Sequence, residues 1–463
     1  MRTLLFCLLM GMAAGLYAQD ENPTYEKVAK TFRYRVNFTD KKGNTYSLKR
    51  PGEFLSAKAL ERRRKYGIKV DEYDLPVTPA YVERLRERGL RVLHVSKWNN
   101  TAVVETADSA LARCLPELSF VKSVRKVWES PDSVQVVARP DRHDYLANKL
   151  DTVDGYYGRA RGQVEMIAAD RLHKAGFRGE GITIAVIDGG FFNADCIDAL
   201  QGCKVLGTRN FTGSGRSVYE EQQHGTMVLS CMATNRPQSL VGTAPEASYY
   251  LLQSEITESE NIVEEDNWCA AVEYADSLGC DIVTSSLGYY EFDDPLASHT
   301  YAEQDGRTAI NSRSASLAAS RGLLVLNSAG NSGNDRWKKI GFPADAKDIL
   351  TVGAVTYERK NTLFSSLGNT ADGRTKPDVM ALGQDAWLLD MTGCTSTANG
   401  TSFSTPILCG GVACLLQACP DKSPKEIIDA VCRSGHNAAT PDNVYGYGIP
   451  DLWKAYQLLT KKK

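Results

Sequence analysis

Three residues of the sequence have the types needed for nucleophilic acyl transfer. Asp188 follows the apolar run ITIAVI (182–187) and precedes two glycines. His224 begins the stretch HGTMV, and Ser402 stands in GTSFSTP (400–406). A serine hydroxyl becomes a nucleophile when a histidine takes its proton and a carboxylate orients that histidine. Taken singly, each residue has an ordinary alternative as a turn former, a structural histidine or a helix N-cap.

The surroundings of Ser402 strengthen its case as a nucleophile. An apolar, helix-compatible run continues behind it to Leu416, and Gly400 permits a close approach of backbone and substrate. A helix N-terminus offers free N–H groups and a favourable dipole to a developing anion. We therefore expect Ser402 to lie where an oxyanion could be stabilised.

With these residues in view, the chain resembles the subtilisin-like serine proteases, or subtilases. The order Asp, His, Ser is that of subtilisin rather than of chymotrypsin or the α/β-hydrolases. The matching stretches are AVIDGG (185–190), HGTMV (224–228), SLG (286–288), SAGN (328–331), KPDVMALG (376–383), GTSFSTP (400–406) and YGYGIPDLWKA (445–455). Three positions depart from the family pattern, namely Met227, Leu382 and Phe403. They bear on packing and pocket shape rather than on catalytic atoms.

The resemblance implies a serine endopeptidase with Asp188, His224 and Ser402 as its triad and an acyl-enzyme intermediate. It places Asn331 as the side-chain donor of the oxyanion hole, together with the backbone N–H of Ser402. It also implies a substrate-binding surface made of Ser286, Leu287, Gly288, Ser328, Ala329, Gly330 and Gly341. The partners are then protein or peptide substrates, with broad specificity because strand pairing reads the backbone. Lys338 and Lys339 lie close in sequence to the first specificity pocket.

The chemistry requires no cofactor. A structural calcium ion is possible by resemblance, but no ligand cluster in the sequence is specific enough to name. No CxxC pair is present and His is scarce at 6 residues, so a zinc site is not indicated.

The elements around these motifs predict an α/β domain at residues 155–463. Its strands are short apolar runs, as in parallel sheets that are buried on both faces. We expect a subtilisin-like doubly wound parallel sheet with helices on both faces and with functional residues at the carboxyl ends of strands. The expected strands are 182–187, 281–286, 322–327 and 349–355, and helices are expected at 228–233, 264–278 and 308–321.

Residues 19–128 predict a smaller α+β domain, followed by a linker at 129–154. The expected strands are 32–39, 91–97, 101–106 and 119–128, and the expected helices are 57–66, 79–88 and 108–114. In size and element order this domain is similar to the propeptide of subtilases, which implies an inactive precursor cut between 128 and 156. The alternative is an independent accessory domain.

Residues 1–18 have the pattern of a signal peptide, with Arg2 before the apolar stretch 4–16. The stretch is too short to span a bilayer, so we expect export without a stable membrane anchor, to the periplasm, the cell surface or the medium. Export permits disulfides, and Cys196 with Cys203, or Cys419 with Cys432, could close short loops.

The formal net charge of −2 gives no indication of nucleic-acid binding. Its distribution is uneven, because residues 19–150 hold 26 Lys and Arg against 18 Asp and Glu, whereas residues 151–463 hold 27 against 38. Opposite charges predict electrostatic attraction between the two parts. Two other functions remain open: a catalytically silent subtilase fold used for binding, and an esterase or lipase, which would favour a GxSxG elbow.

Overall fold

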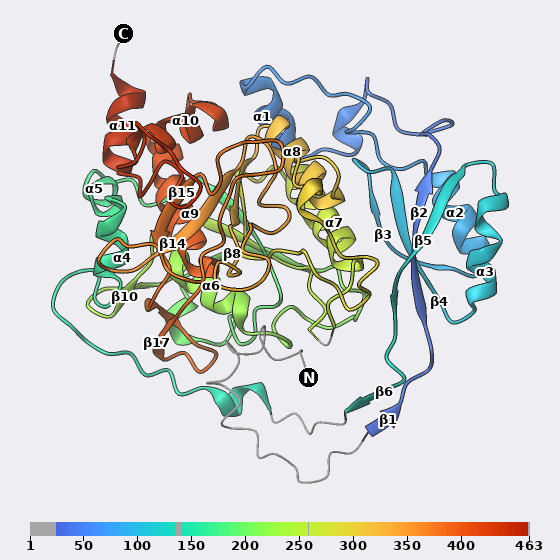
Figure 1. Cartoon of the computed structure of the whole chain (residues 1–463), viewed down its shortest axis with the longest axis horizontal. Helices are drawn as coiled ribbons and strands as arrows, with labels where there is room; N and C mark the ends of the chain where they lie inside the picture. Colours follow the sequence, from blue (N-terminus) through green and yellow to red (C-terminus); the bar gives the residue numbers. More distant parts are fainter. Residues whose placement is uncertain (1–24, 136–140, 258, 462–463) are drawn as a thin grey trace.

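A seven-stranded parallel sheet forms the centre of the larger part of the molecule (Figure 1). The computed structural model describes residues 25–135, 141–257 and 259–461, so the expected signal peptide lies outside the described residues. In spatial order the strands are β15 (Val379–Leu382), β14 (Leu350–Val355), β13 (Leu324–Ser328), β12 (Ile282–Ser285), β7 (Thr183–Asp188), β11 (Ser248–Gln253) and β8 (Lys204–Asn210).

Helices cover both faces of this sheet, as the sequence predicts. In β7, Ile184 and Val186 pack on the side of α6 (His224–Ala233) and α9 (Thr401–Ala418). Their neighbours Ala185 and Ile187 pack on the side of α7 (Val263–Leu278) and α8 (Ile310–Ser320). The remaining elements of this part are α4 (Arg161–Met166), α5 (Ala169–Lys174), α10 (Pro424–Ser434), α11 (Leu452–Thr460) and the hairpins β9 (Asn235–Arg236) with β10 (Leu240–Val241) and β16 (Ala386–Leu389) with β17 (Thr395–Ala398). Because adjacent residues of a strand face opposite sides, an all-apolar strand needs two covering layers.

The N-terminal part is a four-stranded antiparallel sheet that stands beside α7 and α8 (Figure 1). Its strands in spatial order are β3 (Arg91–Ser96), β4 (Thr101–Thr106), β2 (Phe32–Phe38) and β5 (Val121–Glu129), and its helices are α1 (Ala57–Lys65), α2 (Pro79–Glu87) and α3 (Ser109–Arg113). In β4, Ala102 and Val104 pack with Leu85 of α2, whereas Val103 packs with Trp268 of α7. The second face of this sheet is therefore buried against the larger part.

The stretch expected to be a linker has more structure than its sequence indicates. Strand β5 extends through Glu129, and β6 (Ser133–Gln135) pairs antiparallel with β1 (Tyr25–Lys27). Backbone pairing with a distant segment leaves no local sequence period, which is why the sequence analysis did not foresee β6.

The eleven described cysteines are all free thiols, so neither short loop considered above is closed by a disulfide. Cys409 and Cys414 are buried in α9, where a thiol packs as a small hydrophobe. By length and composition α9 is also the one described helix that could cross a membrane. It is 89% buried within the fold, and buried core helices meet the same criterion.

Candidate active site

Asp188 and His224 form a buried hydrogen-bonded pair at the carboxyl edge of the central sheet. Asp188 is the last residue of β7 and is fully buried. Its Oδ1 accepts hydrogen bonds from Nδ1 of His224 at 2.7 Å and from the backbone N–H of Gly189 at 2.8 Å. Because Nδ1 carries the proton in this bond, Nε2 of His224 keeps its lone pair for a second proton.

The charge of Asp188 decides how His224 titrates. Burial by itself would lower the pKa of His224, because a buried imidazole resists protonation. The Asp188 carboxylate and its hydrogen bond outweigh burial, and the charge of Glu255 adds to them, so the pKa lies above its ordinary value.

His224 is placed by a glycine that no other residue could replace. The backbone N–H of Gly225 donates to the carbonyl of Gly190 at 2.9 Å. A Cβ on Gly225 would lie 2.4 Å from that carbonyl oxygen, closer than any real contact. Helix α6 thus begins at His224 itself, pressed against the turn that follows Asp188. The helix therefore begins four residues before position 228, where the sequence pattern predicts its start.

Ser402 is the second residue of α9 and is only 8% exposed. Its Oγ donates to the carbonyl of Ser286 at 3.3 Å, and the hydroxyl of Ser286 donates to the carbonyl of Ser402 at 2.8 Å. The second bond has a clear cause. Pro406 lies four residues further along α9 and has no N–H, so the Ser402 carbonyl lacks its helical partner. Ser286 supplies the missing donor.

Asn331 lies beside the start of α9 with its amide orientation fixed. Its Oδ1 accepts from the backbone N–H of Thr401 at 2.9 Å and from the Thr401 hydroxyl at 3.0 Å. With the oxygen engaged, Nδ2 is left as a donor on the side of Gly400, 3.6 Å from the position of a Cβ there. An oriented amide donor next to a serine at a helix N-terminus is the arrangement that stabilises an oxyanion.

The residues expected to bind substrate are brought together along the same edge. Ser286, Leu287 and Gly288 follow β12, and Ser328 ends β13 with Ala329 and Gly330 behind it. The backbone N–H of Gly341 donates to the carbonyl of Ala329 at 3.1 Å, and a Cβ on Gly341 would touch Gly288 at 3.4 Å. Lys339 is engaged elsewhere, because its ammonium donates to the carbonyl of Gly368 and lies over the ring of Tyr301.

Two acidic features were missed from the sequence, one near this site and one on α7. Glu255 lies two residues beyond β11, and only its place after an apolar run could have indicated it. The other is a row of acids on α7 that face the N-terminal part, at spacings of seven and three residues that return to one face of a helix: Asp266, Glu273 and Asp276.

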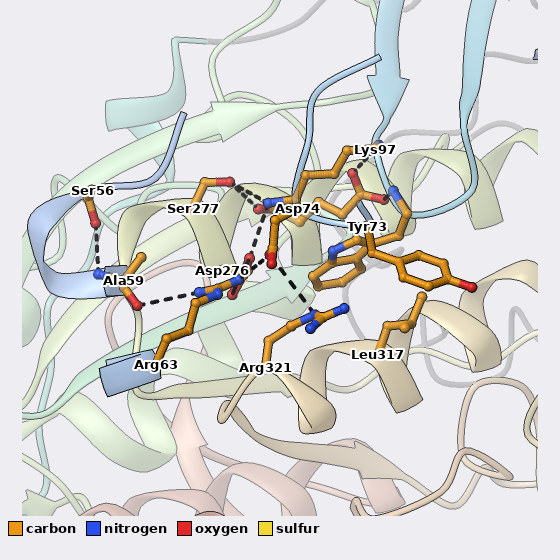
Figure 2. Close-up of polar contacts among 12 residues, drawn as sticks. Ser56, Ala59, Arg63, Tyr73, Asp74, Lys97, Asp276, Ser277, Leu317 and Arg321 are labelled. Carbon is orange, nitrogen blue, oxygen red and sulfur yellow. Dashed lines mark hydrogen bonds and ion pairs between the residues drawn. The ribbon is translucent and has the colours of Figure 1, made fainter. Parts of the chain in front are cut away.

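Asp276 pairs with three cations of the N-terminal part. Figure 2 shows two of them, Arg63 and Lys97. Arg62 approaches its carboxylate at 2.5 Å, Arg63 at 2.8 Å and Lys97 at 3.1 Å, and Asp74 accepts a further bond from Arg63 at 2.6 Å. Burial alone would raise the pKa of Asp276, but the three cations hold it well below its usual range.

Two further acids of α7 extend this contact. Arg35 donates both its Nε and Nη2 to Asp266, at 2.6 and 2.7 Å. Glu273 accepts the backbone N–H groups of Lys97 and Trp98 at 2.6 and 3.2 Å. The basic N-terminal part and the acidic larger part therefore meet through buried ion pairs and not only through their net charges.

Comparisons with known proteins agree with this geometry. The profile of the subtilase family matches residues 179–448, and the profile described as the peptidase S8 propeptide domain of Bacteroidota matches residues 33–141. Subtilisin NAT of Bacillus subtilis subsp. natto is 28% identical over 330 residues, which are 71% of this chain and 76% of that protein. An intracellular serine protease of Paenibacillus polymyxa is 30% identical over 261 residues, 55% of this chain and 72% of that one.

Among solved structures, the epidermin leader peptide processing serine protease of Staphylococcus aureus shares the fold. Its TM-score is 0.64 at 16% sequence identity, and the match covers 94% of this chain and 99% of that one. The protein is a serine-type endopeptidase made as a precursor with a propeptide. The chain belongs to the subtilase family.

The titration of His224 gives a first prediction. Only neutral imidazole can accept the serine proton, so kcat/KM should rise with pH. Its midpoint should lie above about 6.5, the pKa of an unperturbed histidine, because Asp188 raises the pKa. Hydrolysis of a neutral peptide, followed from about pH 5 to about pH 9, measures the midpoint. A flat profile, or a midpoint below that of free histidine, would contradict His224 as the base.

A second prediction concerns Asn331→Ala. We expect its donor to bind the charge that develops in the transition state, so kcat should fall while KM changes little. The expected loss is roughly 10²–10³-fold, the scale known for this kind of donor in subtilisin itself. Steady-state kinetics on one peptide give kcat and KM for the variant and the wild type. An unchanged kcat with a raised KM would mean that Asn331 binds the ground state instead.

Proposed function

We propose that this chain is exported as an inactive precursor and hydrolyses peptide bonds through Asp188, His224 and Ser402. The observation that carries the proposal is the 2.7 Å bond from His224 to a buried carboxylate, at the sheet edge where Ser402 opens α9. Export is supported by the sequence of residues 1–18, and not by resemblance, since one similar protein is an intracellular protease.

The chemistry begins with a change of partner at Ser402. In the proposed reaction its Oγ leaves the Ser286 carbonyl and turns towards Nε2 of His224. His224 takes the proton as Ser402 attacks the scissile carbonyl, and later delivers that proton to the leaving amine. Asp188 stabilises the imidazolium, while Asn331 and the backbone N–H of Ser402 hold the oxyanion. Water then hydrolyses the acyl-enzyme. His224 takes a proton from the water as it attacks the ester carbonyl, and then returns a proton to Oγ of Ser402 as that oxygen leaves.

We also propose that the propeptide inhibits the mature enzyme through the α7 contact. After cleavage, Asp276 would remain alone on α7 if the propeptide left, and Arg62, Arg63 and Lys97 would lose a shared partner. Breaking a buried ion pair on one side is strongly unfavourable. The contact therefore favours a propeptide that stays bound after its peptide bond is cut.

Replacing Ser402 with Ala should abolish peptidase activity and leave the precursor uncut, because we expect the chain to process itself. N-terminal sequencing of the active wild-type form should place the cut between residues 128 and 156. A fluorophosphonate probe should label the wild type and not the variant. A wild type that escapes the probe would support a silent fold, and a start upstream of residue 120 would refute the propeptide assignment.

Asp276→Asn should weaken inhibition by the propeptide about 10²–10⁴-fold, since one-sided loss of a buried ion pair amounts to about 3–5 kcal/mol. The measurement is slow-binding inhibition of mature enzyme by propeptide separated from the processed complex. The matched control is Lys58→Gln in the propeptide, because Lys58 pairs with Asp281 of the larger part and both side chains reach solvent, at 43% and 24% exposure. A solvent-screened pair contributes little, so this control should change inhibition less than about fivefold.

The same assay tests electrostatic attraction. Raising the salt from about 0.1 M to about 1 M shortens the screening length from ~10 to ~3 Å, so the association rate should fall. An association rate that does not change with salt would refute the electrostatic attraction but would not contradict inhibition by the propeptide. Equal inhibition of Asp276→Asn and wild type would refute the role of the ion cluster, meaning Asp276 with Arg62, Arg63 and Lys97.

A further inference from the structure

Three glutamates gather beside the catalytic pair, and the mechanism above uses none of them. Glu255 lies beyond β11, Glu260 follows in the same loop, and Glu264 belongs to the first turn of α7. One carboxylate oxygen of each lies within 4.8 Å of the others. Glu264 is buried and the other two are partly exposed. Within the described part of the chain, no basic side chain forms an ion pair with any of the three.

The contacts of the cluster show which oxygens remain available. Both oxygens of Glu264 accept backbone N–H groups, from Ile256 at 2.7 Å and Asn261 at 3.0 Å. One oxygen of Glu255 accepts the hydroxyl of Tyr289. Calcium takes six to eight oxygen ligands. With Glu264 committed to the backbone, the free oxygens of Glu255 and Glu260 suit a single ammonium or guanidinium group better than a calcium ion.

A buried hydroxyl faces this cluster as well. Ser254 is fully buried, and its Oγ makes no hydrogen bond of normal geometry with the described residues. It nevertheless lies close enough to Glu255 to favour the ionised carboxylate. A buried hydroxyl without a fixed partner, next to carboxylates without a counter-charge, indicates that the cluster is built to meet a ligand.

The cluster follows the strand that pairs with β7, beside the Asp188–His224 pair. Gln253 is the register partner of Asp188, and the backbone N–H of Ser254 donates to the Asp188 carbonyl at 3.0 Å. Tyr289, whose hydroxyl binds Glu255, directly follows the strand 286–288 that we expect to pair with substrate. The charge of Glu255 also acts on His224. Glu255 therefore lies on the β11 side of the catalytic pair, and β13 lies on the opposite side.

The position of Glu255 identifies the substrate residue that it meets. Successive side chains of an extended peptide point to opposite sides. In the arrangement that the resemblance to subtilases implies, a substrate paired with residues 286–288 turns the side chain at the scissile carbonyl towards 328–330 and Gly341, on the β13 side. The side chain one position earlier must then point towards β7 and β11, where His224 and Glu255 lie.

We propose that Glu255, with Glu260, forms an acidic subsite that selects a lysine or arginine immediately before the residue whose carbonyl is attacked. The inference rests on the proposed function, because it takes Ser402 as the nucleophile. It adds a side-chain preference to an enzyme whose strand pairing alone would read only the backbone.

The charge state of the subsite makes this preference depend on pH. Burial raises the pKa of Glu255 to about 7; the bond from Tyr289 and the charge of His224 oppose the rise, and Asp188 adds to it. Glu260 and Glu264 also face the site, and burial together with neighbouring carboxylates raises the pKa of each well above its usual value. Glu255 is thus anionic above neutral pH and increasingly protonated below it, so attraction for a cationic side chain grows as pH rises.

The test uses paired peptides that differ only at the selected position, with lysine in one and its uncharged isostere norleucine in the other. The ratio of their kcat/KM values cancels the titration of His224, which affects both alike. At about pH 8.5 the ratio should be about 10–100, the range of one charge-assisted hydrogen bond. It should fall towards unity near pH 5.5, with a midpoint around 7.

Glu255→Gln should reduce the ratio to less than about threefold and remove its dependence on pH, because the amide keeps the bond from Tyr289 but carries no charge. The matched control is Glu291→Gln, an exposed acid two residues after Tyr289, which should leave ratio and midpoint as in the wild type. If the Glu255 variant does not fold, the pH dependence of the wild-type ratio alone still decides.

Three outcomes would overturn the subsite. One is a wild-type ratio near unity at every pH while the neutral peptide is cleaved, a result that leaves the proposed function intact. Another is a preference that persists unchanged in Glu255→Gln. The third is a preference that calcium chloride abolishes and chelation restores, in which case the cluster binds a metal ion. Failure of the proposed function looks different, since then no peptide is cleaved and no probe labels Ser402.

Discussion

The active site depends on the parallel register of four neighbouring strands. Gln253 of β11 is level with Asp188 of β7, and Ser285 of β12 is level with Ile187. Strands β12 and β13 run on together in the same direction. Because all four strands end at one edge, the Asp188–His224 pair, residues 286–288 and Asn331 all lie at or near that edge. A shift of one strand would separate them.

A missing backbone hydrogen bond in α9 ties Ser402 to the segment that follows β12. Pro406 leaves the Ser402 carbonyl without its helical donor, and the Ser286 hydroxyl replaces it. In exchange, the Ser402 hydroxyl rests on the Ser286 carbonyl. The start of α9 is therefore bound to the segment after β12, so in the proposed mechanism Ser286 would position both the Ser402 nucleophile and the peptide that it attacks. The proline is part of this arrangement, since any residue with an N–H could satisfy the Ser402 carbonyl within the helix.

Much of this could be foreseen from the sequence. The apolar runs that became β7, β12, β13 and β14 are buried on both faces, so their composition alone marks them as strands. Motifs placed Asp188, His224, Ser402 and Asn331 on the same edge. Strand β8 escaped notice because it lies at the end of the sheet and is mostly exposed, with polar residues along it.

Features that arise from distant segments could not be foreseen. The acids of α7 share one helical face, which their spacing alone could have shown. That Asp276 meets Arg62 and Lys97 follows only from how two separate parts pack. Glu255 likewise reads as an ordinary loop acid until β11 places it beside Asp188. Local patterns specify elements, whereas charge partners across the fold are specified by tertiary packing.

The ion cluster on Asp276 also has a consequence for the order in which the chain is made. Arg62 and Lys97 precede Asp276 by 214 and 179 residues. At about 5–20 residues per second, the ribosome releases these cations roughly 10–40 s before their carboxylate exists. During that interval the N-terminal sheet can form, but its basic face has nothing to bury against. The N-terminal part can dock only after α7 has been synthesised, so synthesis of the second half of the protein sets the earliest time of docking.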